Sequence, residues 1–421
     1  DVSINQWVTD ATRLQLATGY RETRGYDVDP NNNEPDSDGF NSKSLKLGIE
    51  HNLDSNWALE SNFNGWENET DFDDGDFGYA DTGSTKSYQV DAGIKYKKDD
   101  LTGQLNSSYN EYENETWIKK NHRDTVSNTS TATTRLDGLI QYHYTEHSYM
   151  LAGADWQRDR LLSKSTGSIA PNRDNTGVFA SMFYSWAPLS FELTGRVDDN
   201  EQFGTYGTWQ SALALSLSQR HKATFSYGTA FKAPTLIQLY GPEDWGSNPN
   251  FEPEKSQNWE LGFVGDYELL DWQLNLYRNE ISNLIDVECD PVTWKCIGYN
   301  SSENADALIK GMEFIVKATT GLVHHTASFD YTDAKDIKTA EQLTRRAKHK
   351  FSWTGDIDVG QANLFAQVLY VGERNDSDWT DVVMPSYTIW NIGARYPLTN
   401  NLTLNGKINN LFDKDYQVVD G

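Results

Sequence analysis

Clustered carboxylates are the residues of this chain whose types and spacing could do chemistry. They crowd into two polar stretches, 25–39 and 70–86, which contain Asp27, Asp29, Glu34, Asp36, Asp38, Asp71, Asp73, Asp74, Asp76 and Asp81. Carboxylates at this density repel one another unless a hard cation neutralises them, and Ca²⁺ accepts about six to eight oxygen ligands. The second stretch lacks the glycine position and the final glutamate of an EF-hand. From the residues alone, a calcium site and a solvated acidic surface both remain open.

The two cysteines, Cys289 and Cys296, lie within one polar stretch. In an oxidising compartment this pair predicts a disulfide that closes a small loop, with free thiols as the alternative. A zinc site would need more ligands than this pair supplies. The sequence also contains no Gly-x-Ser-x-Gly elbow, no His-Glu-x-x-His zinc motif and no glycine-rich phosphate loop. We therefore expect that the protein is not an enzyme.

Composition excludes two further classes of protein. The formal net charge of -26 argues against nucleic-acid binding, which requires basic surface. No segment approaches the roughly 18 consecutive apolar residues that a membrane-spanning helix needs. Hydrophobic residues make up only 37% of the chain, yet it contains 14 Trp and 22 Tyr. This combination suits a membrane-spanning barrel, in which only alternate residues face lipid.

Period-two alternation is the dominant pattern along the chain. Leu45, Leu47 and Ile49 alternate with polar or small residues, and the same pattern recurs at 209–217, 272–276 and 402–408. Such alternation predicts strands with one apolar face. In a soluble β-sandwich that face would pack on a second sheet, whereas in a transmembrane barrel it would contact lipid. The pattern alone does not separate the two architectures.

Connection lengths favour the barrel. Short turns are expected at Thr9–Thr12, Asp54–Asn56, Lys97–Asp100, Thr319–Leu322 and Thr399–Asn401. Long polar connections are expected near 25–39, 70–86, 117–130, 164–174, 233–255, 286–298, 333–344 and 372–385. Strict alternation of short and long links is typical of a transmembrane barrel, and tryptophans near strand ends (Trp57, Trp186, Trp272) suit its aromatic girdles. We expect an all-β fold: one large antiparallel transmembrane β-barrel domain of about 20 strands over residues 1–421.

Two segments carry a family resemblance. Tyr227–Phe263 reads as a strand, a long insert rich in Pro, Gly and acids, and a returning strand, and Asn410–Tyr416 reads Asn-Leu-Phe-Asp-Lys-Asp-Tyr. Both resemble the TonB-dependent outer-membrane receptors. The resemblance implies a monomer in the bacterial outer membrane, surrounded by its lipid, and a parent barrel of about 22 strands. It also implies that an N-terminal plug, which would contact TonB, and the first and last strands lie outside this chain.

Within that family, the chain most resembles its cobalamin-transporting members. The matching passages include Asp36–Phe40, Asp155–Gln157, Asp198–Asn200 and Arg345–Lys348. The resemblance implies TonB-energised import of cobalamin or a related corrinoid through loops ordered by calcium. Its implied calcium ligands are Asp27, Glu34, Asp36, Asp38, Asp73 and Asp81, with a backbone carbonyl from Phe72; its implied cargo contacts are Asp74, Arg345 and Trp379. A siderophore receptor, which would share every barrel motif, and a passive porin are the alternatives.

Overall fold

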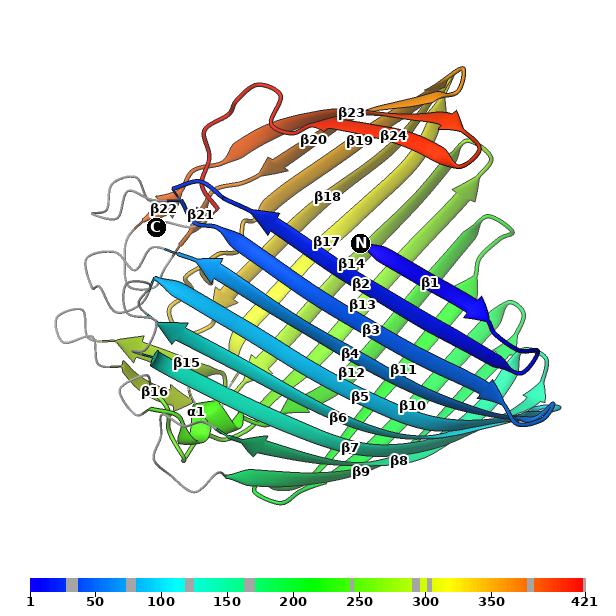
Figure 1. Cartoon of the computed structure of the whole chain (residues 1–421), viewed down its shortest axis with the longest axis vertical. Helices are drawn as coiled ribbons and strands as arrows, with labels where there is room; N and C mark the ends of the chain where they lie inside the picture. The colour runs from blue at the N-terminus through cyan, green and yellow to red at the C-terminus, as the bar shows by residue number, and fades with distance from the viewer. Residues whose placement is uncertain are drawn as a thin grey trace.

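Twenty antiparallel strands form one sheet that curves around a central axis (Figure 1). The computed structural model describes residues 1–27, 37–72, 81–117, 125–162, 171–242, 246–289, 296–300, 305–376 and 382–418. The first ten strands are β1 (Val2–Trp7), β2 (Thr12–Thr23), β3 (Phe40–Asn52), β4 (Trp57–Asp71), β5 (Thr82–Lys98), β6 (Leu101–Trp117), β7 (Thr125–Thr145), β8 (Ser148–Leu161), β9 (Asn172–Trp186) and β10 (Leu189–Asn200). The other ten are β11 (Gly204–Ser216), β12 (His221–Lys232), β13 (Glu254–Tyr267), β14 (Leu270–Ser282), β17 (Ala305–Thr320), β18 (Val323–Asp336), β19 (His349–Val359), β20 (Ala362–Val371), β23 (Tyr387–Thr399) and β24 (Leu402–Ile408).

Three small elements lie outside this sheet. The hairpin of β15 (Ile285–Cys289) and β16 (Cys296–Asn300) interrupts the connection between β14 and β17. A second hairpin, β21 (Arg374–Asn375) with β22 (Val383–Met384), interrupts the one between β20 and β23. A five-residue helix, α1 (Leu236–Tyr240), lies between β12 and β13. The predicted long connections at 286–298, 372–385 and 233–255 are therefore partly structured.

Each strand of the large sheet pairs with its neighbours in chain order. The pairing runs from β1 to β14, continues from β14 to β17, and ends with β20 beside β23 and β23 beside β24. Among the described residues, β1 pairs with β2 and β24 with β23, and neither has a second partner. The predicted extra strand beyond each of them stays a prediction.

The alternation of side chains sets which face is polar. On β10, Leu193 and Val197 lie on the outward face and are 43% and 47% exposed. Arg196 and Asp198 lie on the inward face, where Asp198 is only 3% exposed. The apolar faces of the strands thus form the outer surface, as a lipid-facing barrel requires. A polar lumen follows from the same pattern.

Connections of different length separate the two ends of the barrel. All five predicted short turns are confirmed, and they lie at one end, which we call the turn end (Figure 1). The opposite end, the loop end, holds the eight long connections. The prediction that short and long connections alternate strictly was wrong at one point, because the β10–β11 link at the loop end contains only residues 201–203. The Asn200 side chain makes this tight turn possible, because its Oδ1 accepts hydrogen bonds from the backbone N–H groups of Gln202 and Phe203, each at 3.2 Å.

Two predicted connections are shorter than expected. The stretches 70–86 and 117–130 end early because β5 already begins at Thr82 and β7 at Thr125. Both strand starts are rich in threonine and serine, so they lack the apolar alternation used to place strands. Threonine is β-branched and favours extended backbone, which explains why these polar segments are strands nonetheless.

Aromatic residues mark the turn end of the outer surface. Trp57 is the first residue of β4, and Trp186 is the last residue of β9. They are 40% and 70% exposed, as expected of girdle residues at a lipid–water boundary. Among the described residues, no helix has both the length and the apolar character needed to cross a membrane.

Candidate functional site

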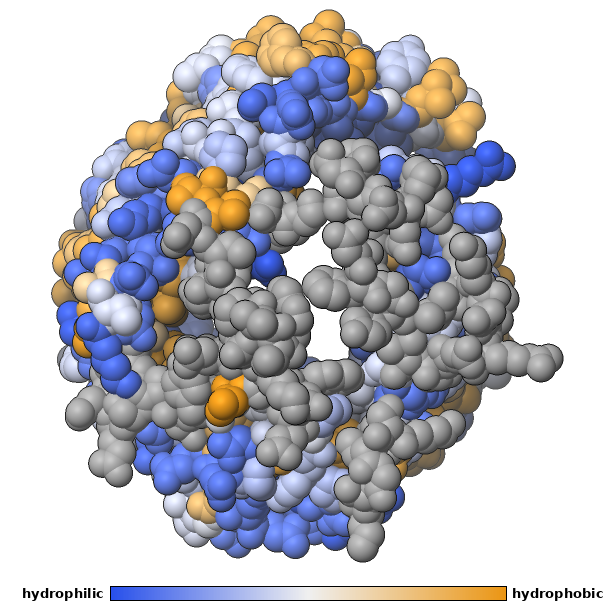
Figure 2. All heavy atoms as spheres, turned by 90° about the vertical axis from the view of Figure 1, so that its left-hand side faces the viewer, coloured by the Kyte–Doolittle hydropathy of each residue, from blue (hydrophilic) through white to orange (hydrophobic). Residues whose placement is uncertain are grey.

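The loop end of the barrel is the candidate ligand-binding mouth. In Figure 2, which looks onto this end, most of the coloured atoms around the rim are hydrophilic. Three groups of polar residues shape the described part of the mouth. They centre on Arg196, Arg173 and Arg345, and each arginine is held by a carboxylate.

Arg196 on β10 forms a clamp across three strands of the inner wall. Its guanidinium binds Asp155 on β8 (Nη1 to Oδ2, 2.6 Å) and Asp198 on its own strand (Nε to Oδ2, 2.8 Å). Between β8 and β10, β9 contributes Gly177, and a Cβ there would lie 2.0 Å from Arg196 Nη2. The missing side chain of Gly177 therefore lets the guanidinium lie flat against the wall. Asp155 and Asp198 are 8% and 3% exposed, so the charged groups of this clamp are fixed in place.

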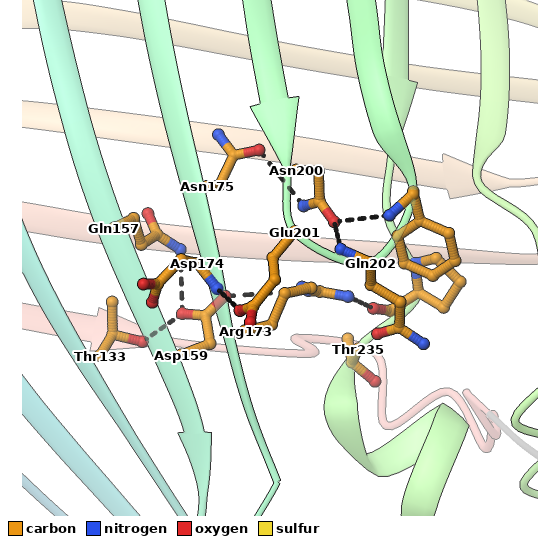
Figure 3. Close-up of polar contacts among 12 residues, drawn as sticks. Thr133, Gln157, Asp159, Arg173, Asp174, Asn175, Asn200, Glu201, Gln202 and Thr235 are labelled. Carbon is orange, nitrogen blue, oxygen red and sulfur yellow. Dashed lines mark hydrogen bonds and ion pairs between the residues drawn. The ribbon is translucent and has the colours of Figure 1, made fainter.

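Arg173 joins the barrel wall to the long connection between β12 and β13 (Figure 3). It lies at the loop end of β9, is 8% exposed, and donates from Nη1 to the Pro234 carbonyl oxygen at 2.7 Å. Its Nη2 lies 3.8 Å from Asp159, and its guanidinium lies over the Phe203 ring at 5.7 Å.

Neighbouring polar side chains fix Asp159 in turn. Its Oδ1 accepts hydrogen bonds from the Thr133 hydroxyl and from the Gln157 amide, each at 2.9 Å. Close by, Glu201 in the short β10–β11 link accepts a hydrogen bond from the backbone N–H of Asp174 at 3.0 Å (Figure 3). The wall, the short link and the long connection thus form one hydrogen-bonded unit.

Helix α1 folds the long connection back onto the mouth. Thr235 caps its N-terminus in a reciprocal capping box: its hydroxyl accepts from Gln238 N at 3.1 Å, and Gln238 Oε1 accepts from Thr235 N at 2.8 Å. Leu236 and Leu239, at 5% and 1% exposed, supply the buried face. Beyond the helix, the Asn248 amide donates to the Gly298 carbonyl at 2.9 Å, which ties the connection to the β15–β16 hairpin.

Arg345, a predicted cargo contact, is held by a buried acid at the loop end. It has a positive φ of 57°, and its backbone N–H donates to the Asn375 carbonyl at 2.7 Å. Its Nε lies 3.2 Å from Asp376 Oδ1, and the two side chains are 61% and 4% exposed. The guanidinium is therefore anchored on one side and accessible on the other. Contact with a cargo remains a prediction.

Backbone hydrogen bonds place three of the predicted calcium ligands, and the calcium site itself stays a prediction. Asp38 donates its backbone N–H to the Tyr26 carbonyl at 3.1 Å, and Phe72 donates to the Asp81 carbonyl at 3.0 Å. Asp27 Oδ1 is buried and has no hydrogen-bond partner among the described residues.

One acid near this set was not among the predicted ligands. Asp71 Oδ1 and Asp81 Oδ1 lie 3.2 and 3.1 Å from the Thr82 hydroxyl. That hydroxyl has one hydrogen and can donate to one carboxylate at a time. Within the part of the chain that the structure describes, no group of three or more His, Cys, Asp or Glu side chains could by itself hold a metal ion.

The remaining predicted site residues are placed in part or not at all. Cys289 and Cys296 are opposite each other in the backbone register of the β15–β16 hairpin, and the disulfide between them stays a prediction. Five predicted residues lie outside the described ranges: Glu34, Asp36, Asp73, Asp74 and Trp379.

Sequence reasoning gave no role to the clamps of Arg196 and Arg173. A signal was present, because charged and amide residues alternate on the inward faces: Asp155, Gln157 and Asp159 on β8, and Arg196, Asp198 and Asn200 on β10. Which of these side chains meet depends on strand register, which the alternation does not reveal.

Comparisons with known proteins agree on the fold. A model of the TonB dependent receptor-like β-barrel family matches residues 2–411. A ferric enterobactin receptor from Pseudomonas aeruginosa superposes with a TM-score of 0.85 at 16% identity, covering 98% of this chain and 71% of that one. A siderophore receptor from Acinetobacter baumannii gives 0.82 at 15%, covering 97% and 72%. The ferric-catecholate import receptor from E. coli K12 gives 0.77 at 13%, covering 99% and 76%.

The Arg196 clamp predicts different effects for two neighbouring glycines. Gly177→Ala places a methyl group where the guanidinium lies, so Arg196 must move away from Asp155 and Asp198. We expect the weakened contacts to lower the free energy of unfolding by about 1–3 kcal/mol. Gly195→Ala is the matched control, because a Cβ at Gly195 meets no atom within 4 Å. Denaturant unfolding of the two purified variants in detergent measures the difference. Equal stability of the two would contradict the packing role of Gly177.

The Arg173 contacts predict that this residue keeps α1 on the wall. Arg173→Ala removes a hydrogen bond from a charged donor, worth on the order of 1.5–3 kcal/mol, so hydrogen exchange over 235–241 should rise at least tenfold. Arg158→Ala is the control, since Arg158 instead binds Asp174 at 2.6 Å. An unchanged exchange rate in Arg173→Ala, with the barrel intact, would show that other contacts hold the helix.

Proposed function

The chain belongs to the family of TonB-dependent receptor β-barrels, and from that premise we propose that its cargo is a ferric siderophore. Proteins of this family are transporters of the Gram-negative outer membrane and are not enzymes. The long connections therefore face the outside of the cell, and the short turns face the periplasm. The candidate ligand-binding mouth, which contains Arg345, therefore lies on the side from which a cargo arrives.

Similarity over almost the whole chain is the observation that carries the proposal. The solved structures reported above are described as receptors for ferric enterobactin, for siderophores and for ferric catecholates, and each superposes over 97–99% of this chain. The comparisons thus favour the siderophore alternative over the corrinoid that the sequence resemblance implied. At 13–16% identity the likeness establishes the fold, and the cargo remains our proposal.

The chemistry of Arg345 supports the same cargo class. Ferric siderophore chelates present oxygen atoms and commonly carry negative charge. An exposed guanidinium offers several N–H donors, and hydrogen bonds from a charged donor are about twice as strong as neutral ones. Since Asp376 already orients Arg345, little side-chain entropy remains to be lost when a ligand binds.

A direct binding comparison on the full-length receptor tests this proposal. We expect ferric enterobactin to bind with a dissociation constant below about 1 µM and cobalamin to bind at least about tenfold more weakly. Tryptophan fluorescence titration, with iron-free enterobactin as a third ligand, measures all three affinities. Tighter binding of cobalamin than of ferric enterobactin would overturn the proposal.

Substitution of Arg345 tests its part in the mouth. Arg345→Lys keeps the charge beside Asp376 and loses the planar fork, so we expect ferric siderophore affinity to fall about tenfold. Arg346→Lys is the matched control, because the side chain of Arg346 is exposed and donates to the Thr344 carbonyl at 3.4 Å. Equal affinities for the two variants would remove Arg345 from the binding surface.

A calcium-ordered corrinoid receptor is a second candidate, and one observation favours it. The buried Asp27 Oδ1 lacks a partner among the described residues, and a hard cation is the kind of group that satisfies such an oxygen. Asp27, Asp38, Asp81 and the Phe72 carbonyl would hold the ion, together with Glu34, Asp36 and Asp73. Calcium would supply positive charge that orders the acidic connections before cargo arrives.

Calcium alone, without any cargo, tests this second candidate. Isothermal titration of the receptor with Ca²⁺ should give a saturable signal, and Asp27→Asn should weaken it at least about tenfold by removing a charged ligand. Asp54→Asn, in a turn at the opposite end, should leave it unchanged. If Ca²⁺ gives no saturable heat with the unaltered receptor, the calcium site is absent, whatever cargo is found.

A further inference from the structure

Three cations lie together on the outward face of the barrel, apart from the mouth. Arg278 on β14 is directly opposite Lys310 on β17, and Lys310 is directly opposite Asp333 on β18. Lys335 follows two residues after Asp333 on the same strand and the same face. All of these positions share the face of the apolar residues Leu276, Met312 and Phe329, which identifies them as outward-facing.

The row of residues that contains these cations marks the outer boundary of the lipid. It continues across the sheet from Arg278 to Trp259 on β13 and to Tyr227 on β12, whose rings lie 4.3 Å apart. Tryptophan and tyrosine gather at lipid headgroup level. Arg278 and Lys310 therefore lie at the headgroups of the outer leaflet.

A buried carboxylate holds the lysines of this patch in place. Asp333 is 7% exposed, and its two oxygens lie 3.7 Å from Lys310 Nζ and 3.4 Å from Lys335 Nζ. The lysine side chains themselves remain 50% and 41% exposed. Each ammonium has three N–H donors, so both keep donors for a group approaching from outside.

The patch carries surplus positive charge. Arg278 is paired with Glu280 (Nε to Oε1, 2.9 Å), so within the described part of the patch three cations share two carboxylates. This positive charge is confined to the patch, whereas the chain as a whole carries a net charge of -26. An anion at this level would be attracted to the patch and repelled by most of the remaining surface.

We propose that Arg278, Lys310 and Lys335 bind the phosphate of a phosphorylated lipid in the outer leaflet. The site lies where such a headgroup is found, and its donors suit a phosphate oxygen. The apolar surface toward the turn end, formed by Leu276, Met312 and Phe314, would receive the acyl chains of the same lipid. The lipid would thereby fix the depth and tilt of the barrel next to the mouth.

Lipid retention by the whole receptor tests the proposal. The receptor is reconstituted in nanodiscs that contain a phosphorylated glycolipid, then exchanged into detergent, and the bound lipid is counted by native mass spectrometry. A titration of the same lipid into delipidated receptor gives the affinity. Lys310→Gln with Lys335→Gln should weaken binding about 30-fold, since each surface lysine contributes about 1 kcal/mol. Lys317→Gln, inward-facing on the same strand, should have no effect.

Two further arms separate the possible sources of the phosphate. In the first arm, a dephosphorylated lipid with the same acyl chains should bind no better to the receptor than to the double variant. In the second arm, inorganic phosphate at about 10 times the lipid concentration should not displace the lipid. Retention that is equal in the receptor and the double variant would falsify the site. Displacement by inorganic phosphate would also overturn it, because the patch would then be a general anion site. A difference in electrophoretic mobility between heated and unheated samples confirms that each variant is a folded barrel.

Discussion

The hydrogen-bonded ladder between neighbouring strands is the constraint on which the rest of this structure depends. Hydrocarbon offers no partner to a backbone N–H or C=O group, so a lipid-exposed sheet must satisfy these groups internally. Pairing from β1 through β24 does this for the strands that the structure describes, apart from the outer edges of β1 and β24. Once the ladder is set, side-chain direction follows with period two: the apolar face must meet lipid and the polar face the lumen. The arginine clamps and the lipid-facing cations are both positioned by this register.

Much of the architecture was accessible from the sequence for that reason. Alternation at Leu45–Ile49 and the short turns report directly on strand face and strand ends, which are local properties. The structure confirmed about 20 strands and placed β12 and β13 on either side of the long excursion. The three-residue β10–β11 link was missed because its turn depends on one side chain, Asn200. Helix α1 was missed because its five residues are too few for a helical period to stand out.

The candidate site was less predictable than the fold, because its contacts depend on strand register and its cargo depends on the chemistry of the loops. Arg345 was found from a resemblance, yet its partner Asp376 lies 31 positions away and comes close only through the β21–β22 hairpin region. Arg196 meets Asp155 across an intervening strand, which no local pattern reveals. Cargo identity is harder still, because related barrels keep one wall while their loops change. The sequence resemblance pointed to a corrinoid, whereas the similar solved structures are described as siderophore receptors.

The short link between β10 and β11 has a consequence for how this family of barrels can diverge. Asn200 closes the link onto Gln202 and Phe203, Glu201 binds the backbone of β9, and Phe203 lies under Arg173. An insertion here would break three separate contacts at once, whereas the longer connections can gain residues at little entropic cost. Evolutionary change in length should therefore gather in the other loops. The rim of this barrel would therefore accept inserted residues in its long connections and resist them at this link.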